Sequence, residues 1–143
     1  CTGLHGANRL ASTSLLEGLL WGFRGAEAAV RELAEADLPN PGDLAQWRMP
    51  EEPEATDPLL IDQDWGLIRS TLWNYAGIVR TGDRLQRAKA DLHYLAHRIE
   101  RFYHESSLSR ELLELRSGIL CARLILNAAL QNPESRGCHY RVD

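Results

Sequence analysis

The chain has 143 residues, of which 44% are hydrophobic and 25% are charged, and its formal net charge is −4 at pH 7. This length and composition are typical of one ordinary globular domain. The mild negative charge gives no electrostatic support to a partner that is nucleic acid or an anionic membrane. Charged residues interrupt the most apolar segment, so no membrane span is predicted, and no signal peptide is predicted either. Three widely spaced cysteines fit neither a disulfide framework nor a zinc site, and they favour a cytoplasmic location.

The opening segment, residues 3–17, reads GLHGANRLASTSLLE and combines a small-residue turn, one arginine and the start of a helix. Glycine and alanine let a ligand or another backbone approach closely. Ser12, Thr13 and Ser14 are all good helix N-caps, and the sequence leaves open which of them serves. Arg9 is therefore expected beside free backbone N–H groups at the positive end of a helix, a setting that suits an anion.

A helix is predicted over about residues 15–36, because apolar side chains recur at three- and four-residue spacing. Three glycines follow a neighbouring stripe, and each costs roughly 1 kcal/mol of helix propensity relative to alanine. Such glycines suit a helix that lies close against another backbone. The segment from Leu38 to Gly42 is expected to stop the helix, and the acidic, proline-rich residues 37–61 are predicted to form a linker.

Three amphipathic helices are predicted beyond the linker. Thr81 and Ser109 are the expected N-caps of the second and third. Short connections between them predict an antiparallel three-helix bundle, and because strand-like alternation is nearly absent the fold class is all-α, with no substantial sheet. The predicted helices cover about residues 62–75, 82–104 and 110–131. The apolar face expected for the first contains Trp65, Ile68, Leu72 and Trp73, and that of the third includes Ile125.

Three stretches of the chain carry a family resemblance. They read TGLHGANRLASTSLLE at residues 2–17, WNYAGIVR at residues 73–80 and ESRGCHY at residues 134–140. In residue identity and order they resemble the C-terminal region of L-aspartate oxidases. The wider relatives of that family are the flavoprotein subunits of succinate dehydrogenase and fumarate reductase. That family commonly has asparagine where this chain has Thr13, which keeps an oxygen but loses the amide donor.

The resemblance implies four parts in this chain. Residues 1–36 are expected to be the end of an FAD-binding domain, with the substrate arginine turn and a helix that faces the flavin. Residues 37–61 are the linker, residues 62–132 the helical bundle domain, and residues 133–143 a C-terminal tail. The Gly-rich dinucleotide fingerprint does not occur in these 143 residues. The remainder of the FAD-binding domain is therefore an expected partner, and the chain alone is expected to be inactive.

The implied enzyme is an FAD-dependent L-aspartate oxidase. It converts L-aspartate to iminoaspartate, is reoxidised by oxygen or fumarate, and serves quinolinate and NAD biosynthesis. By the same resemblance Arg9 is the catalytic arginine that holds a dicarboxylate (L-aspartate or fumarate) over the flavin and assists proton movement. The backbone at Ser14 and Leu15 is implied to be cofactor-binding, facing the flavin ring.

Two other functions stay open. One is a fragment of a succinate dehydrogenase or fumarate reductase flavoprotein, in which Arg9 has the same role but electrons pass to an iron–sulfur partner. The amino-acid sequence of residues 10–14 and 73–80 favours the oxidase. The other is a non-catalytic helical interaction module, in which the glycine stripe of the first helix forms an interface with another chain.

Other polar residues receive structural interpretations. His5 is expected to fix its loop by hydrogen bonding rather than to transfer protons. Arg80, Arg84 and Arg87 are expected to form a solvated basic face or surface ion pairs.

A metal site is not predicted. Three histidines and one glutamate share the helical spacing of metal ligands, but no further ligand converges on them. They are His93, His97, Glu100 and His104. For the tail, the resemblance implies that residues 135–141 fold back onto the flavin domain in the complete enzyme, whereas docking is not expected in this chain alone.

Overall fold

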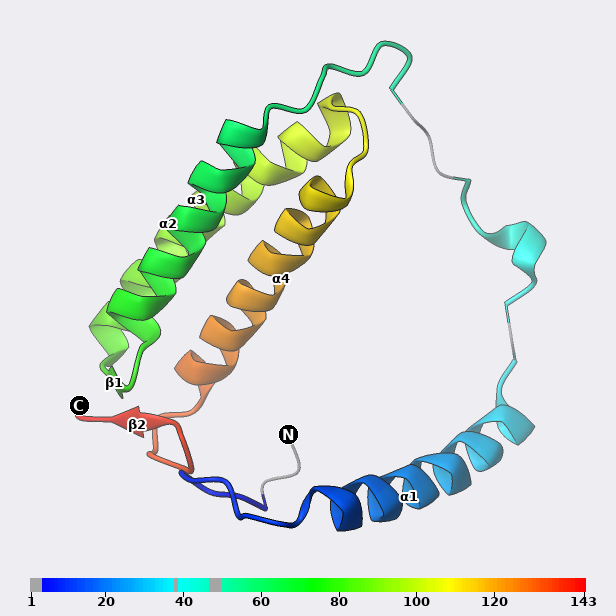
Figure 1. The fold of residues 1–143 in the computed structure, drawn as a ribbon, viewed down its shortest axis with the longest axis vertical. Helices are drawn as coiled ribbons and strands as arrows, with labels where there is room; N and C mark the ends of the chain where they lie inside the picture. The colour runs from blue at the N-terminus through cyan, green and yellow to red at the C-terminus, as the bar shows by residue number, and fades with distance from the viewer. Residues whose placement is uncertain (1–3, 38, 47–49) are drawn as a thin grey trace.

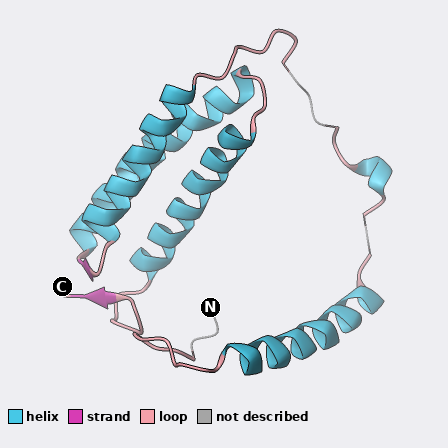
Figure 2. Ribbon diagram, viewed as in Figure 1, coloured by secondary structure: helices cyan, strands magenta, loops and turns pink. Residues whose placement is uncertain are grey.

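The computed structural model describes residues 4–37, 39–46 and 50–143, and these residues are mostly helical (Figure 2). Gly3 of the opening segment and Leu38 of the expected helix stop lie outside the described residues. The expected all-α class is confirmed. The helices are α1 (Ser14–Glu35), a short 3-10 helix η1 (Pro41–Asp43), α2 (Pro58–Ala76), α3 (Gly82–Glu105) and α4 (Arg110–Gln131). Two-residue strands β1 (Val79–Arg80) and β2 (Tyr140–Arg141) pair in parallel.

The starts of the bundle helices follow from local capping. Thr81 and Ser109 cap α3 and α4 as expected, each hydroxyl accepting the N–H three residues on, at 3.3 and 3.1 Å. Helix α2 begins at Pro58. The predicted start, at about residue 62, was therefore wrong by four residues. The carboxylate of Asp57 accepts the N–H of Leu59 at 2.9 Å, and proline suits the first helical position because its missing donor is not needed there.

Helices α2, α3 and α4 pack side by side, and the colour of Figure 1 runs down α2, up α3 and down α4. The buried positions of α3 and α4 alternate in steps of three and four, the spacing that lets side chains of facing helices interlock. The core holds Leu85, Ala88, Leu92, Leu95 and Ile99 from α3, and Leu112, Leu115, Ile119, Ala122, Leu126 and Ala129 from α4.

Two residues expected on packed faces point outward instead. Trp73 is 79% exposed and Ile125 is 51% exposed. In α2 the side chains that contact the core include Trp65, Ile68 and Leu72. Because successive helical residues are turned by about 100°, the residue directly after Leu72 leaves that face. Trp73 is apolar, but its position along the helix does not match the three- and four-residue spacing of the buried face, so the prediction for it was wrong.

Helix α2 also carries a buried charge that the sequence did not reveal. The Asp64 carboxylate is buried and accepts a hydrogen bond from the guanidinium of Arg98 on α3. Buried carboxylates require such partners, because desolvation without compensation is costly. Since α2 begins at Pro58, Asp64 lies in the second turn of the helix, where it faces α3 and contacts Arg98.

Gly118 on α4 gives the bundle a testable packing contact. A Cβ at this position would lie 2.3 Å from Cη2 of Trp65. We expect Gly118→Ala to destabilise the chain by about 1–3 kcal/mol, because the indole must move out of a packed position. The measurement is urea unfolding. Gly66→Ala is the matched control, since a Cβ there meets nothing within 4 Å and alanine favours the helix. Equal changes in the two variants would contradict the packing.

Helix α1 lies apart from the bundle (Figure 1). None of its residues is buried, and its apolar side chains, among them Leu15, Leu19 and Phe23, are exposed. A Cβ at any of its three glycines would meet nothing within 4 Å. Thus the described residues do not supply the close neighbour for which the glycine stripe is suited. None of the described helices combines the length and apolar character that crossing a bilayer requires.

Candidate functional site

The opening loop is held by the His5 side chain. Its Nδ1 accepts the N–H of Leu10 at 3.0 Å, and its Nε2 lies 2.9 Å from Oε2 of Glu17. A backbone N–H can only donate, so Nδ1 carries no proton and Nε2 donates to the carboxylate. The turn itself is closed by Asn8, whose N–H donates to the His5 carbonyl at 3.3 Å, and Gly6 supplies a φ of +56°. His5 therefore fixes the loop, as expected.

Among the described residues, no side chain caps the start of α1. Thr13 occupies the N-cap position, but its hydroxyl lies 3.3 Å from the Leu10 carbonyl and 3.2 Å from Oε2 of Glu17 instead of the first helical N–H groups. Ser12 before it has a φ of +61°, a left-handed conformation that costs a non-glycine residue roughly 1–2 kcal/mol. Backbone strain of this kind is concentrated at functional sites. The first N–H groups of α1 consequently keep their capacity for a ligand.

The predicted site residues lie at this helix start. The Arg9 guanidinium donates to the hydroxyl of Ser14, and both side chains are exposed. Leu15 follows in the first turn and is 89% exposed. Within the described part of the chain Arg9 forms no salt bridge with a carboxylate. The loop thus presents an unneutralised guanidinium next to an uncapped helix N-terminus, an arrangement that can bind an anion.

The C-terminal tail contacts this loop. Residues 136–139 form a turn, closed by two backbone hydrogen bonds of 2.8 and 3.0 Å between Arg136 and His139. The Cys138 thiol lies 3.4 Å from the carbonyl oxygen of Gly6 and 3.6 Å from that of Ala7. In Figure 1 the loop that leads into β2 accordingly lies beside the opening loop. The tail was not expected to dock in this chain alone. It does contact residues 6 and 7, so that expectation was wrong for this contact.

Arg80 connects the tail to the bundle. Its Nε donates to the carbonyls of Ala76 and Gly77, at 3.1 and 2.9 Å, where α2 ends. Its Nη1 lies 3.0 Å from Nδ1 of His139 in the tail. The interpretation of Arg80 as part of a solvated basic face was therefore wrong. Helical spacing describes only neighbours along the chain, and the partner of this guanidinium is 59 residues away.

The tail also caps α3. The N–H of Gly82 donates to Oδ2 of Asp143 at 2.6 Å, and the Arg141 guanidinium binds both oxygens of that carboxylate, at 2.9 and 2.8 Å. These donors hold the pKa of Asp143 well below its usual range, the Arg141 hydrogen bond first and the Gly82 N–H second. A Cβ at Gly82 would lie 2.8 Å from Oδ2, so glycine leaves the space that the carboxylate occupies. Sequence reasoning missed this contact.

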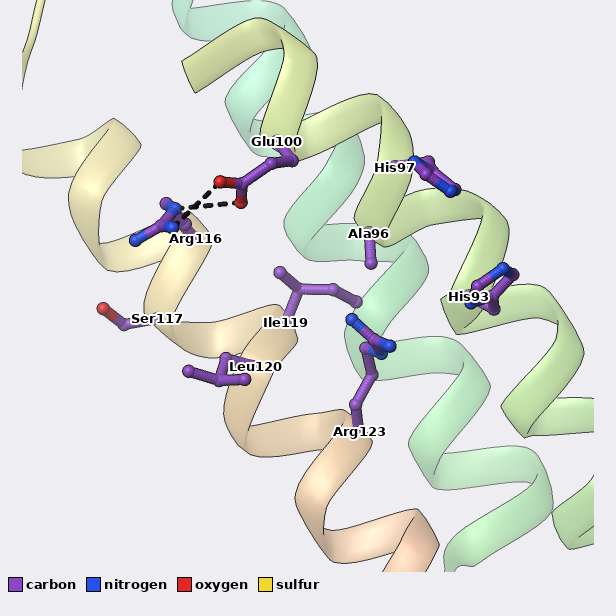
Figure 3. A pocket seen from close by; sticks show the side chains of 9 residues that line it. All are labelled: His93, Ala96, His97, Glu100, Arg116, Ser117, Ile119, Leu120 and Arg123. Carbon is purple, nitrogen blue, oxygen red and sulfur yellow. Dashed lines mark hydrogen bonds and ion pairs between the residues drawn. The ribbon is translucent and has the colours of Figure 1, made fainter. Parts of the chain in front are cut away.

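A surface pocket of about 320 Å³ lies between α3 and α4 (Figure 3). Its lining includes His93, His97 and Glu100, three of the four residues considered as metal ligands. Arg116 binds both oxygens of Glu100 at 2.9 Å and lowers the pKa of that carboxyl, so Glu100 is committed to an ion pair. No group of three such ligands is placed to hold a metal ion among the described residues. None of the lining residues comes from the opening loop or the tail.

Known proteins resemble the whole chain. It is 43% identical over 144 residues to L-aspartate oxidase of Acinetobacter baylyi and 41% identical over 142 residues to L-aspartate oxidase of Pseudomonas aeruginosa. Each comparison covers 99% of this chain and 26% of the relative. A chloroplastic L-aspartate oxidase of Oryza sativa is 35% identical over the full chain, which covers 24% of that relative. The chain thus spans about a quarter of the length of these relatives.

The resemblance read from the opening, middle and closing stretches is confirmed by these identities. In addition, residues 67–143, more than half of the chain, match the family described as fumarate reductase flavoprotein C-term. That match covers the bundle from the third turn of α2 onward, together with the tail that contacts the Arg9 loop. The chain therefore belongs to the fumarate reductase flavoprotein C-terminal family.

Proposed function

We propose that the chain is the C-terminal part of an FAD-dependent L-aspartate oxidase and that it supplies the arginine that binds the substrate. The observation that carries this proposal is the Arg9 guanidinium at the uncapped start of α1. A guanidinium presents a planar pair of donors that matches a carboxylate and stays charged throughout the physiological pH range. L-aspartate and fumarate are both dicarboxylates and offer the required group.

The helix start fits the flavin. The first N–H groups of α1, next to Ser14 and Leu15, have no side-chain cap, and such groups stabilise negative charge at the edge of a ring. When bound, FAD would accept the hydride that leaves the substrate. This chain would contribute the N–H groups that face the ring and Arg9, which orients the substrate carboxylate above it. Oxygen or fumarate is the proposed acceptor for reoxidation, and quinolinate and NAD biosynthesis in the cytoplasm is the proposed context.

The remainder of the FAD-binding domain is the proposed partner of α1. The apolar face of this helix is exposed, and its glycine stripe is open to another backbone. Burial of apolar surface is the main favourable contribution to association, so a helix of this kind requires a covering partner. The chain spans about a quarter of the length of its relatives, and the other three quarters of such a protein have ample length to provide one.

A chimera tests the function directly. The chain replaces the corresponding C-terminal quarter of the Acinetobacter baylyi L-aspartate oxidase, to which it is 43% identical. We expect the purified chimera to bind FAD and to release hydrogen peroxide when given L-aspartate, and Arg9→Ala to abolish that release. The unmodified relative serves as the positive control.

Two results would overturn the proposal in different ways. Reduction of a dye with succinate, without peroxide from L-aspartate, would favour a succinate dehydrogenase or fumarate reductase flavoprotein. Failure of the chimera to bind FAD, combined with a stably folded and monomeric isolated chain, would favour a helical interaction module.

A further inference from the structure

A continuous series of contacts links the bundle to the Arg9 loop. It begins at the end of α2, where Arg80 binds two carbonyls, and passes through the Arg80–His139 hydrogen bond into the tail. The turn at residues 136–139 then reaches Gly6 and Ala7 through Cys138. Gly6 belongs to the same turn that His5 closes. Arg9 lies in that loop, three residues after Gly6.

The His139 ring is the component of this series that can change state. Arginine has only donors, so Nδ1 of His139 must accept from Arg80 and carries no proton. Nε2 then carries the proton and donates to the carbonyl of Asn132, at 2.9 Å, where α4 ends. Both ring nitrogens are therefore used, and only the neutral ring satisfies both contacts.

We propose that Arg80 and His139 are positioning residues, through which the helical bundle holds the tail turn against the loop that carries Arg9. This inference rests on the proposed function for the role of Arg9. Protonation of His139 removes the acceptor at Nδ1 and sets an imidazolium against the guanidinium of Arg80. Arg141 adds a further positive charge nearby, with an Nη1 that lies 3.4 Å from the Asn132 carbonyl, and Asp143 is occupied by Arg141 and Gly82. The docked tail thus requires neutral His139.

Amide exchange on the 143-residue chain tests the contact without any catalysis. The N–H groups of Asn8 and Leu10 donate within the loop and report its order. A hydrogen bond to a charged group contributes enough for its loss to lower protection about tenfold, so His139→Ala should give about that decrease at both amides. His97→Ala, an exposed histidine on α3, is the matched control and should change neither. Unchanged loop protection in His139→Ala would overturn the proposal.

A second variant separates positioning from folding. Gln can accept a hydrogen bond from Arg80 but cannot be protonated at neutral or mildly acidic pH. When the pH is lowered from about 7.5 to about 5.5, the wild-type loop should lose about tenfold more protection than the loop of His139→Gln. The two proteins differ only at residue 139, so a difference in their pH dependence belongs to that residue. Identical pH dependence would overturn the proposal, and intact protection in the core of α3 and α4 shows that the bundle is folded.

The chimera shows whether the contact serves the reaction. We expect His139→Ala to raise KM for L-aspartate about tenfold, because a displaced Arg9 binds the carboxylate less well. Arg80→Lys should give a smaller increase, since an ammonium can donate to His139 or to the α2 carbonyls but lacks the fork that reaches both. An unchanged KM in both variants would overturn the role in substrate binding. Were the chimera inactive with its native tail, the proposed function would fail while the exchange result would still decide the contact.

Discussion

In the chimera, Arg9→Lys is expected to lower kcat/KM for L-aspartate by roughly 10²- to 10⁴-fold, the range that misplacement of a binding group and loss of assisted proton transfer produce. Lysine keeps the positive charge but loses the planar pair of donors, so the carboxylate is held at one point and can rotate. Steady-state peroxide formation as a function of L-aspartate concentration measures the change. The flavin absorbance should remain that of the parent, because Arg9 is proposed to contact the substrate and not to hold the cofactor.

The control for this substitution is Arg24→Lys. Arg24 is an exposed arginine on α1 that pairs with Glu27 at 3.3 Å, a surface contact worth little. Its replacement should leave kcat/KM within a factor of about two. Unchanged turnover of Arg9→Lys on L-aspartate would remove the assignment of Arg9 as the substrate arginine.

Leu126→Ala is expected to destabilise the 143-residue chain by about 2–5 kcal/mol, the range for truncating a fully buried leucine. Leu126 is 0% exposed and lies in the interlocking core of α4. The loss combines the transfer energy of the deleted atoms with the cavity that remains, which a closely packed bundle fills only in part. Urea unfolding followed by circular dichroism at 222 nm measures the difference.

Leu124 provides the comparison on the same helix. It is 59% exposed, two residues before Leu126, and its truncation should change the free energy of unfolding by less than about 0.5 kcal/mol. Similar losses at both positions would contradict the burial pattern of α4.

The helices were predictable because their apolar spacing is local information. The three- and four-residue steps along α3 and α4 identify the buried face from sequence alone, and the hydroxyls of Thr81 and Ser109 mark two of the helix starts. The predictions were wrong at residues whose amino-acid type suggested one environment and whose position in the helix gave another. The proline-rich composition around Pro58 predicts a linker, but proline also suits the first helical position, which Pro58 occupies. Trp73 was assigned to the core for its apolar character although it lies off the face set by its neighbours.

The candidate site was only partly accessible to such reasoning. Arg9, Ser14 and Leu15 stand in one short motif, and the structure brings the first two into contact. The sequence offers Ser12, Thr13 and Ser14 equally as the N-cap, and a Ser12 φ of +61° has no signature in a sequence. The partners of Arg80 and Cys138 lie far away along the chain, so no local pattern could have identified them.

The contact between Cys138 and Gly6 joins residues 132 positions apart and so closes almost the entire chain into a ring. For a fully flexible ring of this length the length-dependent part of the closure entropy would be about 4 kcal/mol, from (3/2)RT ln n, and the rigid helices within the ring lower that cost. Any partner that fixes α1 relative to the bundle removes much of this entropy before the tail docks. If α1 docks onto the proposed flavin domain, that docking and the docking of the tail onto the Arg9 loop are therefore cooperative, and each raises the effective concentration for the other. Covering the exposed face of α1 would in this way also stabilise the contact between the tail and the Arg9 loop.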